Sequence, residues 1–215
     1  MSSKFRHLEN KSVNGVIHVG AHRGEEVLDY KNLGASTVIW IEANPDVFTE
    51  MQQALSANPV LTSMLYCVAA SDVDDEEVDF HICYGPDAGY MVGNKGCSSL
   101  LEPVGWMAGW KKETIKCQTI TLDTLLFRNN INVSAFNLLN MDVQGAEMLV
   151  LKGATGLLNS KDLKYVTSEV TFKNPDYAGG ELFPAIEKYL SLFKFRHVET
   201  VMQHPNWGDA LFVRE

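Results

Sequence analysis

The sequence predicts an α/β fold: a doubly wound, mostly parallel seven-stranded sheet that ends in a C-terminal antiparallel hairpin strand. Short β-branched or apolar runs alternate with helical patterns along most of the chain, which is typical of a parallel sheet covered by helices. The last two strand patterns, 196–201 and 209–214, leave no room for a helix between them, so the final strand should run antiparallel. The 215 residues show no break in composition and predict a single domain, 1–215.

The first half of the chain predicts two strand and helix units. Residues 15–19 (GVIHV) form a strand, and 24–33 carry apolar residues at helical spacing. Residues 37–41 (TVIWI) form the next strand, and Asn44-Pro45 begins a helix, because proline suits the first helical turn. A third strand at about 64–68 leads to an acidic turn and to an alternating segment at 78–82.

Residues 83–114 are rich in glycine and aromatic residues and lack a clear period. Unpatterned segments of this length are often lids or binding loops, so we expect an insertion that covers a ligand. Beyond it the patterns predict strands at 115–120, 136–141 and 164–170, and helices at 122–129, 146–158 and 181–193.

Charge and cysteine spacing limit the partners and the compartment. The formal net charge is −9 with no basic run, so nucleic acid and anionic membrane surfaces are not expected as partners. The cysteines, Cys67, Cys83, Cys97 and Cys117, have no C-x-x-C spacing and are interpreted as reduced thiols. The polar first residues and the lack of a long apolar run complete the expectation of a cytoplasmic protein.

Ligands of a doubly wound sheet bind beyond the carboxyl ends of the strands, so the residues after each strand are the candidate site. The first loop runs from Gly20 through Ala21, His22 and Gly24 to Glu25. Its two glycines let the backbone turn tightly beside a ligand, but a dinucleotide usually takes three, as G-x-G-x-x-G. An ordinary tight turn between strand and helix is the alternative.

The second and third strands add a candidate nucleoside site. Glu42 follows Gly20 by about 20 positions, where an acid accepts the ribose hydroxyls of an adenosine, and Ala43 comes next. Ala70, Ser71 and Asp72 leave space for an adenine edge. The alternatives are a solvated acid at a helix start for Glu42 and a plain polar turn for 70–72.

Asp142 directly follows the buried strand predicted at 136–141 and comes just before Gly145 and a helix. A carboxylate there either orients the cofactor's amino group or takes a proton from an acceptor hydroxyl. Glu169 follows the same logic after the next strand. The alternative for Asp142 is a helix N-cap.

Together these motifs resemble the FkbM-type methyltransferases of class I. The resemblance runs from about residue 16 to 213 and rests on VIHVGAHRGEE, VIWIEANP, AASD, CSSL, TLDTLL and, most specifically, LLNMDVQGAEMLVLKGA. It implies a Rossmann-like methyltransferase fold that binds S-adenosylmethionine, with the methionine part near Gly20 to Gly24, the ribose on Glu42 and the adenine near Ala70 to Asp72. It also implies O-methyl transfer to a sugar or another hydroxyl-bearing metabolite.

The first loop departs from the family pattern, which often has Asp at His18 and Asn at His22. Glu25 or Asp142 would then hold the methionine ammonium. His18 and His22 are both candidate cofactor residues, with a hydrogen-bonded core residue and a turn residue as the alternatives. Ser99, in CSSL, is a further candidate contact.

An alcohol is a poor nucleophile at neutral pH, so methyl transfer to a hydroxyl needs a general base. Asp142 is the first candidate base and His204 the second, and Glu169 is a further catalytic candidate. Rings for stacking on a sugar are Tyr84, Tyr90, Trp106, Trp110 and Trp207, unless they only pack the insertion. No metal is predicted, although Asp142, Glu169 and Asp209 offer oxygen ligands.

Two other functions remain open, a nicotinamide-dependent oxidoreductase and a non-catalytic glycan-binding module. The missing third glycine disfavours the oxidoreductase, and only His18 and His22 favour the glycan-binding module. A monomer or a homodimer is expected.

Overall fold

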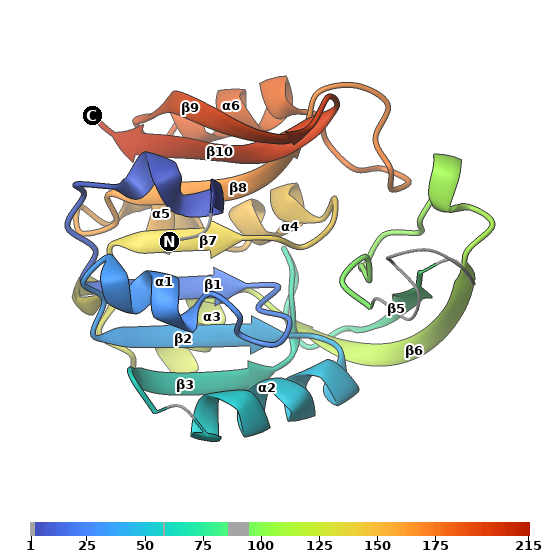
Figure 1. Ribbon diagram of the computed structural model, residues 1–215, viewed down its shortest axis with the longest axis horizontal. Helices are drawn as coiled ribbons and strands as arrows, with labels where there is room; N and C mark the ends of the chain where they lie inside the picture. The colour runs from blue at the N-terminus through green and yellow to red at the C-terminus, as the bar shows by residue number, and fades with distance from the viewer. Residues whose placement is uncertain (1–2, 58, 86–94) are drawn as a thin grey trace.

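A computed structural model describes residues 3–57, 59–85 and 95–215 and confirms the predicted fold class (Figure 1). Seven strands form the main sheet in the order β3-β2-β1-β7-β8-β10-β9. Neighbours pair in parallel except β10, which is antiparallel to both β8 and β9. The strands are β1 (Gly15–Val19), β2 (Thr37–Glu42), β3 (Thr62–Cys67), β7 (Leu138–Met141), β8 (Tyr165–Thr171), β9 (Phe195–His204) and β10 (Trp207–Arg214).

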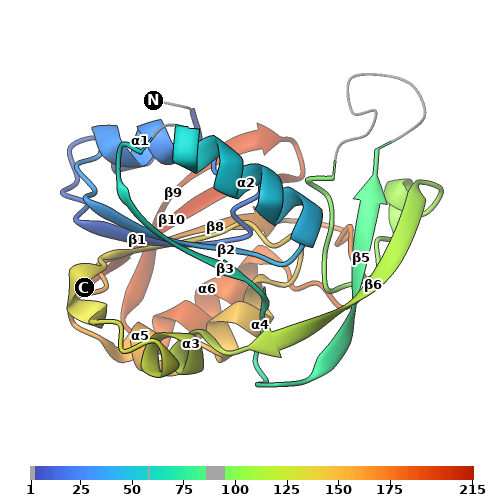
Figure 2. The same ribbon diagram turned by 90° about the horizontal axis from the view of Figure 1, so that it is seen from below.

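Helices cover both faces of this sheet, as Figure 2 shows. One face carries η1 (Ser3–Leu8), α1 (Val27–Asn32) and α2 (Pro45–Ala57). The other carries α3 (Leu122–Arg128), α4 (Glu147–Lys152), α5 (Thr155–Asn159) and α6 (Phe183–Ser191). Two further short 3-10 helices of the described residues are η2 (Gly105–Met107) and η3 (Val133–Ala135).

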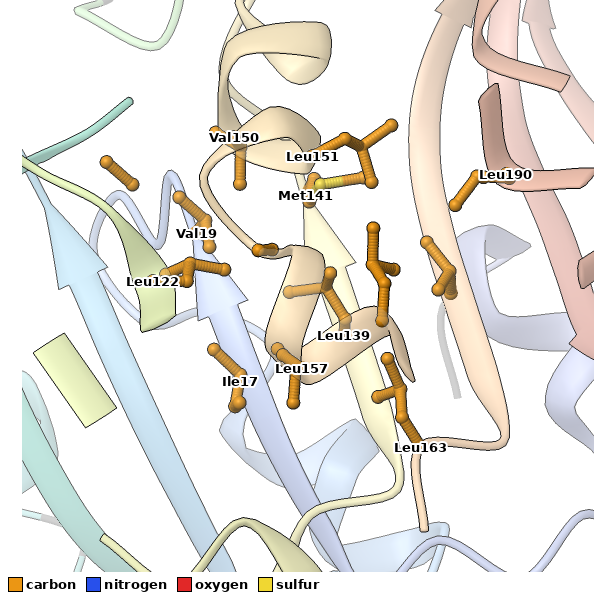
Figure 3. Close-up of a cluster of buried hydrophobic side chains, with 14 of the residues drawn as sticks. Ile17, Val19, Leu122, Leu139, Met141, Val150, Leu151, Leu157, Leu163 and Leu190 are labelled. Atoms are coloured by element: carbon orange, nitrogen blue, oxygen red, sulfur yellow. The ribbon is translucent and has the colours of Figure 1, made fainter. Parts of the chain in front are cut away.

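The hydrophobic core has two parts, one on each face of the sheet. Ile17 and Val19 of β1 point into the cluster under α3 to α6, which Figure 3 shows with Leu139, Val150 and Leu157 around them. Val16 belongs to the cluster on the opposite face. All five residues of β1 are therefore buried, which is why this central strand is a continuous apolar run with one histidine in it.

The helix predicted at 146–158 is in fact two helices. A Cβ on Gly153 would lie 2.0 Å from the carbonyl oxygen of Ser71, so the chain passes that loop closely between α4 and α5. The Asp123 carboxylate then accepts hydrogen bonds from the amides of Gly156 at 2.6 Å and Leu157 at 2.9 Å. These bonds satisfy free amides at the start of α5, which begins a new helix there.

Both ends of the predicted insertion, 83–114, lie in a hairpin arm formed by strands β5 (Glu77–Tyr84) and β6 (Lys111–Ile120). The two strands pair antiparallel from Glu77 opposite Gln118 to Tyr84 opposite Lys111. With β4 (Ala69–Ala70) they form a second sheet in the order β4-β6-β5, which extends beyond the carboxyl ends of the main strands (Figure 1). The strand predicted at 115–120 therefore belongs to this smaller sheet.

Within the described residues, no helix combines the length and the apolar character that crossing a lipid bilayer requires.

Candidate active site

Two adjoining cavities lie at the carboxyl ends of the parallel strands. The first, of about 570 Å³, is bordered by the loops after β1, β2 and β7 and by the arm. Of the predicted residues, those that line it are Gly20, His22, Glu25, Glu42, Ala43, Ala70, Asp142, Glu169 and Trp207. This volume is within the usual range of small-molecule sites, and the place is where the strand order reverses between β1 and β7.

Gly20 brings the loops after β1 and β7 together. Its φ is 76°, and a Cβ there would lie 1.9 Å from the backbone oxygen of Asp142. Only glycine permits this approach. The amides of Gly20 and Ala21 both donate to the carbonyl of Ile41, which ties the same loop to β2.

Glu42 ends β2 with a buried carboxylate at the wall of the first cavity. Its Oε2 accepts from the amide of His22 at 2.9 Å, and its Oε1 accepts from the amide of Asn44 at 2.8 Å. Burial raises the pKa of this carboxyl, and the two amides oppose the rise. Each oxygen keeps a second lone pair, so the fixed carboxylate can accept hydroxyl donors from a ligand.

At the edge of the same cavity, His22 and Glu25 form an ion pair, with 2.8 Å between Nδ1 and Oε1. The hydrogen bond to Glu25 raises the pKa of His22 more than burial lowers it. Burial would raise the pKa of Glu25, but the bond from His22 brings a net lowering. The side of the cavity near β4 is apolar instead, with Val68, Ala69, Ala70, Phe80 and Leu100.

Gln144 connects the two carboxylates at the ends of β7 and β8. Its Nε2 donates to Asp142 Oδ1 at 2.7 Å and lies 3.4 Å from Glu169 Oε2. Its Oε1 is 3.0 Å from the Tyr177 hydroxyl. Two ionised carboxylates can only accept, so the amide must turn its NH₂ group toward them and its oxygen toward Tyr177.

Hydrogen bonds fix the backbone around Gln144 as well as its side chain. Its φ is 56°, and its carbonyl accepts from Ser99 Oγ at 2.8 Å. Glu147 Oε1 lies 3.2 Å from the amide of Val143 and 3.3 Å from that of Gly145. Burial, aided by the charge of Asp142, raises the pKa of Glu147 to about 7.

The second cavity, of about 620 Å³, adjoins the first and shares Gly96, Gln144, Glu169, Gln203 and Trp207 with it. Trp106, Tyr177 and Trp207 give it aromatic walls, and His204 lies on its lining. Its carboxylates are Glu147, Glu169, Asp176 and Glu181. Glu169 and Gln144 therefore stand where one cavity opens into the other.

Comparison with known proteins decides the family. The model of the methyltransferase FkbM domain matches residues 18–197, which is most of the chain. The chain belongs to the FkbM methyltransferase family. Comparison with curated protein sequences gave no significant match.

Solved structures agree on the fold. Methyltransferase FkbM from Methylobacillus flagellatus superposes with a TM-score of 0.60 at 13% identity, over 94% of this chain and 44% of that one. The chain therefore spans less than half the length of that FkbM protein. A SAM-dependent methyltransferase from Aquifex aeolicus has a TM-score of 0.52 at 9% identity, over 100% of this chain and 90% of that one. The ribosomal protein L11 methylase of Lactobacillus delbrueckii has a TM-score of 0.53 at 14% identity, over 99% of this chain and 77% of that one.

Several residues predicted to contact a cofactor do not line either cavity. The side chain of Ala21 is in the core, and a Cβ on Gly24 would contact Leu55 rather than a ligand. Ser71 is buried, with its hydroxyl 3.3 Å from Asp72 Oδ1, and Ser99 reaches the Gln144 carbonyl. These residues shape the loops around the first cavity.

His18 is a core residue. It is 1% exposed, and its Nδ1 lies 3.1 Å from the Tyr30 hydroxyl. The chain of polar contacts continues from Tyr30 to Asn140 at 2.9 Å and from Asn140 to Thr167 at 2.6 Å, under α1 and across β7 and β8. Because β1 turns its odd-numbered and even-numbered side chains to opposite faces, His18 lies on the α1 face, beneath the loops that line the first cavity.

Of the described rings expected to stack on an acceptor, some line the second cavity and others do not. Trp106 and Trp207 line the second cavity, while Trp110 packs edge-on against Trp106 with 4.8 Å between ring centroids. Tyr84 lies on the arm and donates to Glu113 at 2.7 Å. Tyr90 lies outside the described residues.

Sequence reasoning missed Gln144, Gln203, Lys95 and Phe80, all of which line the first cavity. Gln144 could have been predicted as a site residue, because it lies two positions after Asp142 in the loop after β7. Phe80 comes from β5 of the arm and Lys95 from the segment between β5 and β6, and no local pattern specifies where either lies relative to the main sheet. In the part of the chain that the structure describes, no three His, Cys, Asp or Glu side chains gather as a metal site would require.

Proposed function

We propose that this FkbM domain binds S-adenosylmethionine in the first cavity and transfers its methyl group to a hydroxyl of a sugar or related small metabolite in the second. The observation that carries the proposal is the junction of the two cavities at Gln144 and Glu169. A two-substrate transfer needs two sites that meet at the reacting atoms.

The residues of the first cavity fit this cofactor. Glu42 is a fixed acceptor for the ribose hydroxyls, and the apolar wall from Val68 to Ala70 suits the flat adenine. The close approach at Gly20 leaves the loop backbone beside the space for the methionine part. When bound, S-adenosylmethionine supplies a methyl carbon that the adjacent sulfonium makes electrophilic.

The chain's own task is to position the acceptor and accept its proton. Asp142 lines the first cavity, and Gln144 fixes its Oδ1 at 2.7 Å, so we assign to Asp142 the acceptor's hydroxyl proton. Glu169 lines both cavities and orients the same hydroxyl. His204 lines only the second cavity and is exposed, which makes it the second candidate base.

Titration calorimetry with S-adenosylhomocysteine and NAD tests the cofactor, and transfer of labelled methyl groups to a panel of saccharides tests the reaction. We expect S-adenosylhomocysteine to bind, NAD not to bind, and a saccharide hydroxyl to be labelled. Binding of NAD alone would favour the oxidoreductase. Binding of S-adenosylhomocysteine without transfer to any hydroxyl would contradict the O-methylation.

A further inference from the structure

We propose that the second cavity selects an acceptor that carries a positive charge beside its hydroxyl groups, such as an amino sugar. The inference rests on the proposed function, because it takes the second cavity as the acceptor site, and it deepens that function by naming the acceptor's charge.

The first argument is the charge of the lining. Glu169, Asp176 and Glu181 line the second cavity, and no Lys or Arg of the described residues does. Residues 86–94, which the structure does not describe, contain Asp87 and no basic residue in the sequence, so they bring no compensating cation. An anionic acceptor would meet like charge here, at a cost that grows as water is excluded.

The second argument is that nearby cations are already neutralised. Lys95 and Arg23 line the first cavity, but Lys95 Nζ lies 3.0 Å from Asp46 and Arg23 Nε pairs with Glu50 at 2.5 Å. Neither lines the second cavity. Among the described residues, the charged side chains that line the second cavity are therefore carboxylates, with His204 as the group there that can gain a positive charge.

The third argument is the aromatic wall, which is independent of the acids. Trp106 and Trp207 line the cavity, and Trp106 Nε1 donates to Asp176 Oδ1 at 3.0 Å. That bond holds a ring and a carboxylate side by side. Ring faces and carboxylates both attract ammonium groups, and rings also cover the apolar face of a sugar.

The state of Asp176 agrees with this arrangement. Its carboxyl is partly buried, and burial raises its pKa, while the Trp106 bond and the nearby His204 oppose the rise. Among the described residues it has a ring N–H donor but no Lys or Arg partner. A ligand ammonium would place beside this carboxylate a positive charge that no Lys or Arg of the described residues supplies.

Three sugars that share the glucopyranose ring but differ in charge test the proposal: D-glucosamine, which is cationic, D-glucose, which is neutral, and D-glucuronate, which is anionic. Each is titrated by ligand-observed NMR into the full chain, with and without S-adenosylhomocysteine, at low and high salt. We expect glucosamine to bind about tenfold more tightly than glucose at low salt and glucuronate to bind most weakly. High salt should reduce these differences.

The variant D176N locates the effect, and D162N is its control, since it removes the same charge at the opposite ends of the strands, in the loop before β8. D176N should reduce the preference for glucosamine about two- to fivefold, and D162N should leave it unchanged. Equal or absent binding of the three sugars, tighter binding of glucuronate, or equal effects of the two variants would overturn the proposal.

The same titrations separate this proposal from the proposed function. If S-adenosylhomocysteine fails to bind while glucosamine is preferred, methyl transfer fails and the cation-selective cavity stands. If S-adenosylhomocysteine binds and the three sugars do not differ, only the selectivity fails.

Discussion

Asp142 is the residue on which the proposed reaction depends most. Its Oδ1 accepts from Gln144 at 2.7 Å and it lines the first cavity. Replacing it in D142N keeps the shape but removes the proton acceptor. We expect kcat to fall roughly 10²- to 10⁴-fold while the affinity for S-adenosylhomocysteine changes only a few-fold. Full turnover by D142N would remove Asp142 from catalysis.

Gln144 is expected to act by positioning rather than by contact with the methyl group. Because its φ is 56°, glycine is tolerated there, and Q144G deletes the amide that fixes Asp142. We expect kcat to fall at least about tenfold with the free energy of unfolding changed by no more than about 1 kcal/mol.

The control for Q144G is N130G, because Asn130 has a similar φ of 52° and is exposed after α3. Its activity should match the unsubstituted protein. If Q144G and N130G have the same kcat and the same pH profile, the positioning role of Gln144 is refuted.

At the scale of elements, the start of α4 carries a pH dependence. The pKa of Glu147 is about 7 in the folded state against 4.5 unperturbed, because the carboxyl is fully buried. Between these values the folded chain holds a proton that the unfolded chain has released, so this residue's contribution to stability falls as pH rises from 4.5 to 7. The full change is about 3 kcal/mol.

The variant E147Q keeps an oxygen for the amides of Val143 and Gly145 but cannot ionise. Its free energy of unfolding relative to the unsubstituted protein should therefore rise by about 3 kcal/mol between pH 4.5 and about 8. Denaturant titrations at several pH values measure the difference. A constant difference across that range would contradict the buried titration.

The break between α4 and α5 depends on Gly153. A Cβ there would meet the Ser71 carbonyl at 2.0 Å, so G153A must push the helix pair away from the loop after β4. We expect a loss of about 2 to 4 kcal/mol of unfolding free energy. The same change at Gly109, which has nothing within 4 Å, should cost less than about 0.5 kcal/mol. Equal losses in the two variants would show that the contact is not what requires glycine.

For the whole molecule, the sheet could be predicted because its central strands β1, β2 and β7 are buried on both faces and its helices carry regular apolar stripes. The first cavity's sheet-side residues could be predicted for a related reason, since Glu42 ends the parallel strand β2 and Gly20 and Asp142 directly follow β1 and β7. From the sequence alone, His18 could be either a core residue or a cofactor contact. The sequence of a strand does not show which elements cover each of its faces.

The strand at 115–120 and the alternating segment at 78–82 were predicted, but the position of the arm that they form was not. Phe80 of β5, and Lys95 and Gly96 of the segment between β5 and β6, line the first cavity because the arm extends beyond the main sheet, a tertiary placement that local periodicity does not encode. Trp106, His204 and Trp207 of the second cavity were predicted as acceptor or catalytic residues. Its acidic lining was not predicted as a whole, because it brings together residues from α4, from β8 and from the segment 175–181.

The most direct test of the account is a crystal structure of the protein grown with S-adenosylhomocysteine. The account predicts the ribose hydroxyls on Glu42, the adenine against Val68 to Ala70, and the sulfur facing the junction at Gln144 and Glu169. Density for the ligand outside the first cavity, or in it without contact to Glu42, would contradict the central claim.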